Sequence, residues 1–171
     1  YKYSYSNILI KKFKNKFSSL RIIGMGGSIL GMKAIYNFLK FKIKKKIFFV
    51  DNLVSYRKNA KEKNYLNLII SKSGNTLETI SNVNLLINKK TKNIFVTENK
   101  DNYLRKLAHK LKSEIVDHND FIGGRYSVLS EVGMLPASLV GLNEKKFKQF
   151  NSLIKKKSFI NSLIQNVNNI L

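Results

Sequence analysis

Residues 66–79 read LNLIISKSGNTLET, which is an apolar run, then a turn rich in hydroxyl groups, then the start of a helix. A short and almost wholly apolar run bounded by turn residues is typical of a strand buried on both faces of a parallel sheet. The polar turn of residues 71–76 would therefore lie at a strand end and at a helix N-terminus, where α/β proteins bind anions.

The same alternation of short apolar runs and longer helical segments extends in both directions from this stretch. Strands are predicted at 20–24, 46–51, 66–71, 92–97 and 114–117. Helices are predicted at 28–41, 55–63, 76–88 and 102–111. Strands that alternate with helices indicate a parallel sheet covered on both faces. We therefore expect an α/β fold, a three-layer αβα sandwich around a five-stranded parallel sheet.

Two regions lie outside this alternation. Residues 1–18 are predicted to form an N-terminal helical arm, and the chain is helical again from Ser127 onward. Pro136 should kink the helix that contains it. Residues 143–171 are expected to form C-terminal helices, with amphipathic segments at 145–155 and 159–171. Because no repeat or linker interrupts the chain, we expect residues 1–171 to be one domain, and a chain that begins with Tyr rather than Met to be part of a longer protein.

The composition excludes several classes of site. The chain has 43% hydrophobic residues, enough to build a core, and it has no cysteine. The absence of cysteine excludes disulfides, thiolate metal ligands and a cysteine nucleophile, and it fits a reducing cytoplasm. No apolar run approaches the ~20 residues of a membrane-spanning helix. We expect a cytoplasmic protein with no membrane partner.

The net charge of +22 favours contact with polyanions. The excess comes from lysines spread over separate segments, whereas arginine, which reads guanine edges in DNA, is rare. The arginines are Arg21, Arg57, Arg105 and Arg125. We expect solvated lysines and no specific nucleic acid partner. A nucleic-acid-binding protein that tolerates many sequences remains the alternative.

The loop at 71–76 is predicted to bind a phosphate. Its hydroxyl groups and the backbone N–H groups near Gly74 would face an anion that the helix dipole also attracts. It is not a Walker loop, because the G-x-x-x-x-G-K-[ST] pattern is absent. The alternative interpretation is helix capping, with Asn75 as N-cap and Glu78 three residues later.

A glycine turn follows the first predicted strand, where residues 24–31 read GMGGSILG. Such glycines expose backbone N–H groups to an anion at the start of a helix. Asp51 ends the second predicted strand, as in dinucleotide-binding proteins, but Ile29 stands where their third glycine would be. The fingerprint for a dinucleotide is therefore broken, and the remaining alternative is a turn that only packs strand against helix.

A third glycine-rich stretch, GGRYS at residues 123–127, precedes the last helical block. Paired glycines let the backbone approach a ligand, and the neighbouring Arg125 would supply a fixed cation. The alternative is an arginine that only satisfies loop carbonyls.

Taken together, GMGGSILG, ISKSGNTLET and GGRYSVLSEVGMLPASLVGL resemble the glucose-6-phosphate isomerase (phosphoglucose isomerase) family, specifically its first sugar-isomerase domain. The resemblance covers residues 20–142 and implies a flavodoxin-like sugar-isomerase fold. The family interconverts glucose 6-phosphate and fructose 6-phosphate in glycolysis and gluconeogenesis by proton transfer through an enediol(ate). It uses neither a metal nor an organic cofactor. The resemblance also implies a homodimer.

The resemblance assigns roles to individual residues. The substrate-binding residues would be Gly27, Ser28, Ser71, Lys72, Ser73, Gly74, Asn75 and Thr76. The backbone of Gly124 and the guanidinium of Arg125 would face the sugar and stabilise the enediolate. Glu78 matches a family carboxylate that orients a catalytic histidine, a role that competes with capping.

The sequence also departs from the family. The family's glutamate base, its histidine and its C-terminal lysine lie in segments that are absent here. His109 and His118 match no motif and are expected to be structural or exposed, and Glu131 has no assigned role. We expect residues 1–171 to bind sugar phosphate weakly without isomerising it. A non-catalytic sugar-phosphate sensor with the same fold is the alternative.

Overall fold

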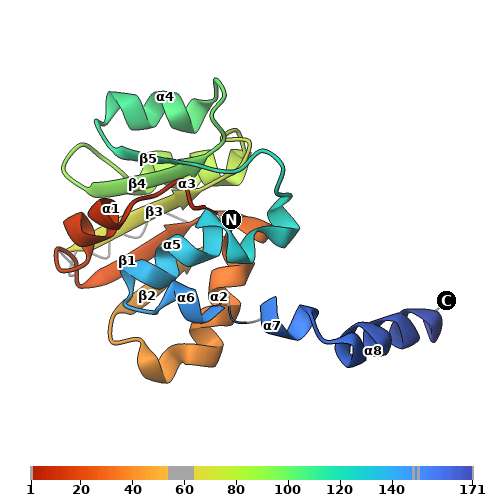
Figure 1. Cartoon of the computed structure of the whole chain (residues 1–171). Coiled ribbons are helices and arrows are strands. Elements are labelled where there is room, and N and C mark those ends of the chain that lie inside the picture. The colour runs from red at the N-terminus through yellow and green to blue at the C-terminus, as the bar shows by residue number, and fades with distance from the viewer. Residues whose placement is uncertain (1, 54–63, 148, 150, 171) are drawn as a thin grey trace.

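The computed structural model describes residues 2–53, 64–147, 149 and 151–170 (Figure 1). The described strands are β1 (Ser19–Ile23), β2 (Lys46–Val50), β3 (Tyr65–Ile70), β4 (Lys92–Thr97) and β5 (Glu114–Asp117). They form one five-stranded parallel sheet in the order β2-β1-β3-β4-β5. Each predicted strand agrees with an observed one to within a residue at either end. The helix predicted at 55–63 lies outside the described residues.

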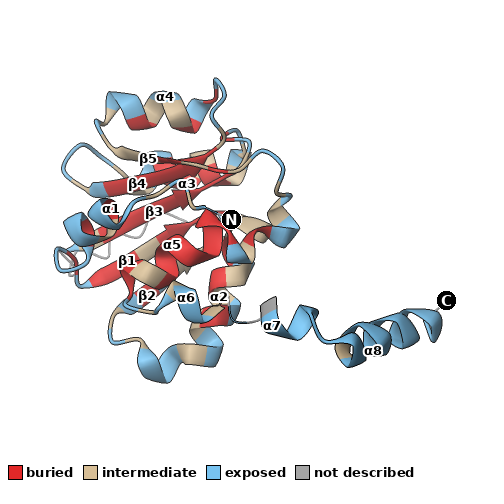
Figure 2. Cartoon of the chain, in the orientation of Figure 1, coloured by how far each residue is buried: buried red, intermediate tan, exposed pale blue. Residues whose placement is uncertain are grey.

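Helices cover both faces of this sheet. The helices α1 (Asn7–Phe13), α2 (Gly27–Leu39) and α5 (Glu131–Leu139) share a core with one face, whereas α3 (Leu77–Leu86) and α4 (Tyr103–Lys110) share a core with the other. Successive strand residues point to opposite faces, which is why the strands are apolar throughout. Figure 2 shows the buried residues concentrated in the strands and on the inner sides of these helices. The predicted three-layer αβα sandwich is confirmed.

The strand order reverses at β1, which has β2 on one side and β3 on the other. The segments that leave the carboxyl ends of β1 and β3 therefore diverge to opposite faces of the sheet. In doubly wound sheets this point leaves a crevice at the carboxyl edge. Two of the three predicted motifs, at 24–28 and 71–76, lie at this edge.

The chain after β5 differs in part from the prediction. A 3-10 helix, η2 (Gly124–Leu129), precedes α5, which contains Pro136 as expected. The amphipathic segment predicted at 145–155 contains two short helices in the described residues, α6 (Glu144–Phe147) and α7 (Asn151–Ile154). Phe147 packs against the core, whereas Leu153 and Ile154 are exposed.

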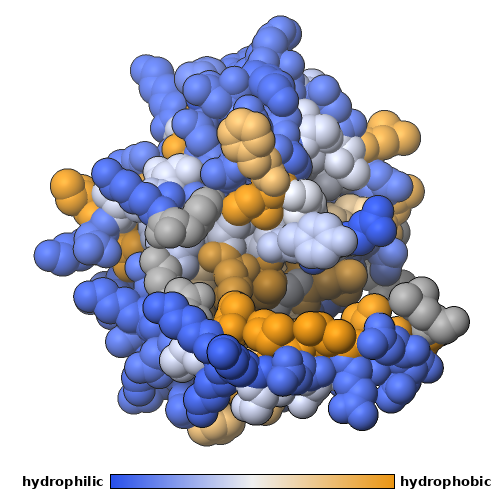
Figure 3. Space-filling model, turned by 45° about the vertical axis from the view of Figure 1, so that its right-hand side comes forward, coloured by the Kyte–Doolittle hydropathy of each residue, from blue (hydrophilic) through white to orange (hydrophobic). Residues whose placement is uncertain are grey.

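The last helix, α8 (Lys157–Asn168), extends away from the sheet in Figure 1 and has no buried residue. Its exposed apolar residues recur at helical spacing: Ile160, Leu163, Ile164 and Val167. Figure 3 shows hydrophobic side chains gathered in a band along a hollow, with hydrophilic ones around it. Among the described residues, no helix is both long and apolar enough to cross a membrane.

The N-terminal arm explains Glu131, for which the sequence suggested no role. Glu131 is fully buried, and its Oε1 accepts hydrogen bonds of 2.9 Å from both the backbone N–H and the hydroxyl of Ser4. The Tyr5 hydroxyl donates to Glu144 at the start of α6. Burial and the nearby carboxylates of Glu144 and Glu131 raise the pKa of Tyr3 to about 12. The two carboxylates thus anchor the arm against α5 and α6.

Candidate functional site

A hollow of about 290 Å³ opens at the carboxyl edge of the sheet, near the reversal in strand order. It is lined by Met25, Gly27, Ser28, Lys72, Ser73, Thr76, Glu98 and Gly124. These residues come from the segments after β1, β3 and β4 and from the start of η2. All three predicted motifs therefore contribute to one hollow, although they are far apart in the sequence.

The first and third motifs meet through their backbones. A Cβ atom added to Gly27 would lie 2.2 Å from the carbonyl oxygen of Gly124 and 2.9 Å from the backbone nitrogen of Arg125. Such distances are far below van der Waals contact, so only glycine allows this approach. The hydroxyl of Ser127 lies 3.5 Å from the carbonyl oxygen of Gly27 and donates at 2.6 Å to that of Gly124. The glycines thus place the start of α2 directly against the segment that contains Arg125.

The hydrogen bonds of the phosphate loop, defined as residues 71–76, differ from those that the capping interpretation predicts. Helix α3 begins at Leu77, and its N-cap is Thr76, whose side chain makes no capping bond. Instead the Thr76 hydroxyl lies 2.9 Å from the hydroxyl of Ser71, the buried first residue of the loop. The predicted capping box of Asn75 and Glu78 is therefore wrong. Thr76 and Ser73 are left to line the hollow.

Asn75 and Gly74 contact a different helix. The Asn75 Oδ1 accepts a 3.0 Å hydrogen bond from the Tyr103 N–H, and the Gly74 carbonyl accepts one of 3.1 Å from Leu104. Gly74 has a φ of +66°, and a Cβ there would lie 2.0 Å from the Oδ1 of Asn102, which caps α4. Neither Gly74 nor Asn75 lines the hollow. They fasten the phosphate loop to the N-terminus of α4, a contact that sequence patterns cannot show.

Helix N-termini around the hollow are uncapped by side chains. Helices α1, α4 and α5 receive a side-chain capping bond from Ser6, Asn102 and Ser130, respectively. The N-caps of α2 and α3, Gly26 and Thr76, give none. These two helices begin at the hollow, so their positive dipole ends face it. An anion there would take the place that a capping side chain takes in α1, α4 and α5.

Lys72 and Glu98 form the charged wall of the hollow. The Lys72 ammonium lies 3.3 Å from Glu98 Oε1 and donates at 2.7 Å to the carbonyl oxygen of Asp120, and Lys100 lies 3.1 Å from Glu98 Oε2. Burial alone would raise the pKa of Glu98, but the hydrogen bonds and charges of Lys100 and Lys72 outweigh it and hold that pKa below its usual range. No sequence motif pointed to Glu98, and Met25 lies in the predicted glycine turn without an expected role. Glu98 directly follows β4, so its place at a strand end was the available signal.

The residues predicted to act on the sugar lie at the margin. Gly124 lines the hollow, but Arg125 and Glu78 do not. Arg125 is exposed, and no hydrogen bond or ion pair joins it to another residue in the described part of the chain. Glu78, in the first turn of α3, is half-buried and likewise makes none with the described residues. Both charges are therefore available to a partner or substrate.

Neither histidine lines the hollow. His109 is exposed in the last turn of α4. His118 is buried, and its Nδ1 lies 2.9 Å from the carbonyl oxygen of Asn119. Within the described ranges, no group of three or more His, Asp or Glu side chains is arranged to hold a metal ion.

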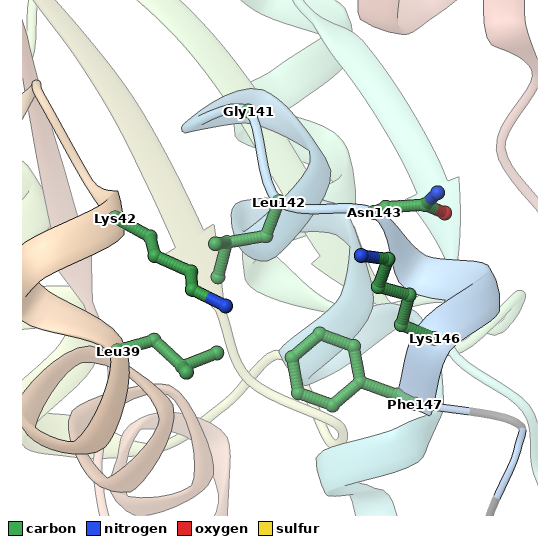
Figure 4. Close-up of a pocket in the computed structure, with 7 residues that line it drawn as sticks. All are labelled: Leu39, Lys42, Gly141, Leu142, Asn143, Lys146 and Phe147. Carbon is green, nitrogen blue, oxygen red and sulfur yellow. The ribbon is translucent and has the colours of Figure 1, made fainter.

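A second hollow, of about 360 Å³, lies where α2 ends (Figure 4). Figure 4 shows Leu39, Leu142 and Phe147 around an apolar space, with Lys42 and Lys146 beside it. Helix α2 has 13 residues, so this hollow is about 20 Å along the helix from the first one. It has neither hydroxyl groups nor carboxylates in its lining. We therefore take the smaller hollow at the carboxyl edge as the functional site.

Comparison with known proteins identifies the family of the chain. Residues 11–168 match the family model described as phosphoglucose isomerase. The chain belongs to the phosphoglucose isomerase family. A glucose-6-phosphate isomerase of Mycoplasma genitalium is 35% identical over 94% of this chain and 41% of its own length. One from Methanocaldococcus jannaschii is 33% identical over 80% of this chain and 37% of its own length. The chain thus spans about two fifths of these relatives.

Solved structures share the fold at low sequence identity. A hypothetical protein from Thermus thermophilus has a TM-score of 0.77 at 20% identity, over 94% of this chain and 45% of its own. The tagatose-6-phosphate ketose/aldose isomerase of Escherichia coli has a TM-score of 0.60 at 15% identity, over 82% and 42%. The Vibrio vulnificus NanR protein, solved in complex with ManNAc-6P, has one of 0.56 at 17% identity, over 96% and 60%. The fold of this member of the family is that of sugar-isomerase domains.

Proposed function

We propose that the chain is the sugar-phosphate-binding part of a glucose-6-phosphate isomerase. The phosphate of the substrate would bind between the uncapped N-termini of α2 and α3, with hydroxyl groups from Ser28, Ser73 and Thr76. The observation that carries this proposal is the backbone contact between Gly27 and Gly124, because it brings the Arg125 segment to the same hollow.

The chemistry would be proton transfer between C2 and C1 of the open-chain sugar, through an enediol(ate). A fixed guanidinium such as that of Arg125 would stabilise the negative charge that develops on the enediolate oxygens. Glu78, which has no hydrogen-bond or ion-pair partner among the described residues, would orient a histidine supplied from outside this chain. We further propose that the complete enzyme is a cytoplasmic homodimer of glycolysis and gluconeogenesis that uses no metal or organic cofactor.

The reaction also needs a base, and the hollow does not offer a free one among the described residues. Its lining includes one carboxylate, Glu98, which is ion-paired with Lys72 and Lys100 and whose pKa lies below the usual range. A carboxylate held ionised in this way is a weak base at neutral pH. We therefore infer that residues 1–171 bind the substrate without turning it over.

The test combines titration calorimetry with a coupled isomerase assay on the 171-residue chain. Fructose 6-phosphate should bind more tightly than inorganic phosphate, and turnover should stay at background. Turnover at an ordinary enzymatic rate would contradict the missing base. Failure to bind either ligand would contradict the site itself.

The paired state of Glu98 also favours a second candidate, a non-catalytic sugar-phosphate sensor. This alternative predicts the same binding. The sequence of the gene beyond Leu171 separates the two, because an isomerase requires a following segment with the missing glutamate, histidine and lysine. If no such segment follows, the sensor is the better interpretation.

A further inference from the structure

Lys72 lies in the phosphate loop, but its ammonium is engaged with other parts of the chain. It donates to the carbonyl oxygen of Asp120 at 2.7 Å and lies 3.3 Å from Glu98. The Lys72 side chain is 28% exposed and that of Glu98 only 13%, so the contact is shielded from bulk water. A lysine whose only task was to attract a phosphate would not be tied to a neutral carbonyl in another loop.

The bond to Asp120 connects two segments that the proposed substrate must touch together. Asp120 lies four residues before Gly124 and five before Arg125, on the stretch that leads from β5 into η2. The backbone of Lys72 is itself fixed, because its carbonyl oxygen accepts from the Glu98 N–H at 3.0 Å and from the Thr97 hydroxyl at 3.2 Å. The ammonium is therefore carried on a rigid base and can hold the less constrained segment.

We propose that Lys72 is a positioning residue, which sets where the Gly124–Arg125 segment lies relative to a phosphate bound in the loop. Glu98 holds the ammonium in the direction of Asp120, and Lys100 balances the second carboxylate oxygen. Lys72 then contributes to recognition of the sugar end more than to binding of the phosphate. This inference rests on the proposed function only in naming the sugar phosphate.

The proposal predicts that Lys72→Met weakens the binding of fructose 6-phosphate more than the binding of inorganic phosphate. Lys72→Met keeps the aliphatic length of the side chain but removes its charge and donors. Inorganic phosphate should bind this variant within about threefold of the unchanged chain, because the Lys72 ammonium is already engaged by Glu98 and the Asp120 carbonyl oxygen. Fructose 6-phosphate should bind about tenfold or more weakly, because the loss of a hydrogen bond from a charged group misplaces the segment that faces the sugar.

The experiment measures both affinities for the 171-residue chain and for Lys72→Met, Lys72→Arg and Glu98→Gln, with Lys89→Met as an exposed control on the surface. Amide hydrogen exchange reports residues 118–126 and 71–76 separately. Lys72→Met should increase exchange in 118–126 alone, Lys72→Arg should restore most of the lost affinity, and Glu98→Gln should give a smaller loss of the same kind.

The other outcomes overturn either this proposal or the function on which it rests. An equal loss of both ligands would mean that Lys72 contacts the phosphate directly, and unchanged values for both would mean that the contact has no role. If the unchanged chain binds neither ligand but Lys72→Met still raises exchange in 118–126, the proposed function fails while the positioning contact stands. If exchange rises equally in both segments, Lys72 is a general stabilising residue and the inference is wrong.

Discussion

The phosphate loop and the segment of residues 118–125 face the same hollow, but the chain holds them differently. The loop is bonded internally, between Ser71 and Thr76, and externally to the N-terminus of α4. The other segment has local hydrogen bonds to Asn119 and one from His118 to Thr97. Toward the hollow it is held by the Lys72 contact, the glycine contact at Gly27 and a bond from Ser127, and its Phe121 is almost fully exposed.

This difference suggests that the loop serves phosphate binding and the other segment serves recognition of the sugar. A loop that is already held by several hydrogen bonds loses little conformational entropy when it binds an anion. Its own hydroxyl groups can donate to that anion. The segment that carries Arg125 keeps its charge free of partners in the described chain and is completed by what binds there. Phosphate binding should therefore be robust, whereas recognition of the sugar should be easy to disturb.

The largest effect should come from Gly27→Ala, which disrupts the contact between the start of α2 and the segment of residues 118–125. The new methyl group would overlap the Gly124 carbonyl, so the 118–125 segment or α2 must move. Affinity for fructose 6-phosphate should fall on the order of a hundredfold, the size of loss that a displacement of about 1 Å produces at an oriented site. Calorimetric titration measures it.

Gly123→Ala is the matched control for this change, because a Cβ at Gly123 meets only the Tyr126 ring at ordinary contact distance, 3.5 Å. Equal losses in the two variants would contradict the assigned contact.

A smaller effect is expected when the rigid region itself is weakened. Thr76→Val keeps the shape of the side chain but removes the hydroxyl that lines the hollow and bonds Ser71. Phosphate and fructose 6-phosphate should both bind about tenfold more weakly, the worth of one hydrogen bond to a charged group.

Thr79→Val in the same helix serves as control for Thr76→Val, because the buried Thr79 hydroxyl has no hydrogen-bond partner among the described residues. It should leave both affinities unchanged and should not lower the melting temperature. If Thr79→Val weakened binding as much as Thr76→Val, the loss would be a general effect on α3.

Arg125→Ala tests the segment of residues 118–125 instead of the phosphate loop. Its guanidinium is exposed, so binding of fructose 6-phosphate to the isolated chain should weaken only about two- to fivefold. Binding of inorganic phosphate should not change, and Arg125→Lys should give an intermediate value, as parallel titrations would show. A clear drop in phosphate affinity would place Arg125 in the phosphate site instead.

The smallest effect concerns pH. Because Glu98 has a lowered pKa in the folded chain, its ionised form stabilises folding above the unfolded pKa of about 4.3, and this contribution falls as the pH drops through the folded value. The free energy of unfolding, from urea titrations, should decline more steeply below about pH 4 in the unchanged chain than in Glu98→Gln. Parallel declines would show that Glu98 does not titrate as its contacts with Lys72 and Lys100 require.

Much of this architecture follows from the sequence. The strands could be placed because both-face burial leaves continuous apolar runs, and even β3 was recognised although Asn67 lies within it, buried and bonded to Asn93. The three motifs could be placed in one site because parallel strands end at a common edge. The turn residues and the expected parallel arrangement of the strands together were enough for this.

Contacts between distant residues could not be predicted in the same way. Asn75 is a residue type that often caps helices, but it accepts a hydrogen bond from Tyr103, 28 residues away. Glu131 likewise accepts a hydrogen bond from Ser4, 127 residues away. The direction of the Lys72 ammonium likewise depends on Asp120 and Glu98. A sequence pattern indicates which local structure a residue prefers. The positions of these side chains depend instead on residues that come close only in the folded chain.

The contact of Gly27 with Gly124 has a consequence for how this family can vary. The spacing between the start of α2 and the Gly124 segment is set by backbone atoms, because not even one Cβ would fit between them at Gly27. No rotamer change can lengthen or shorten it, so side chains around the hollow can diverge without altering the length of ligand that fits. Selection for sugars of another chain length would have to act on the loops that set this contact, rather than on the residues that line the hollow.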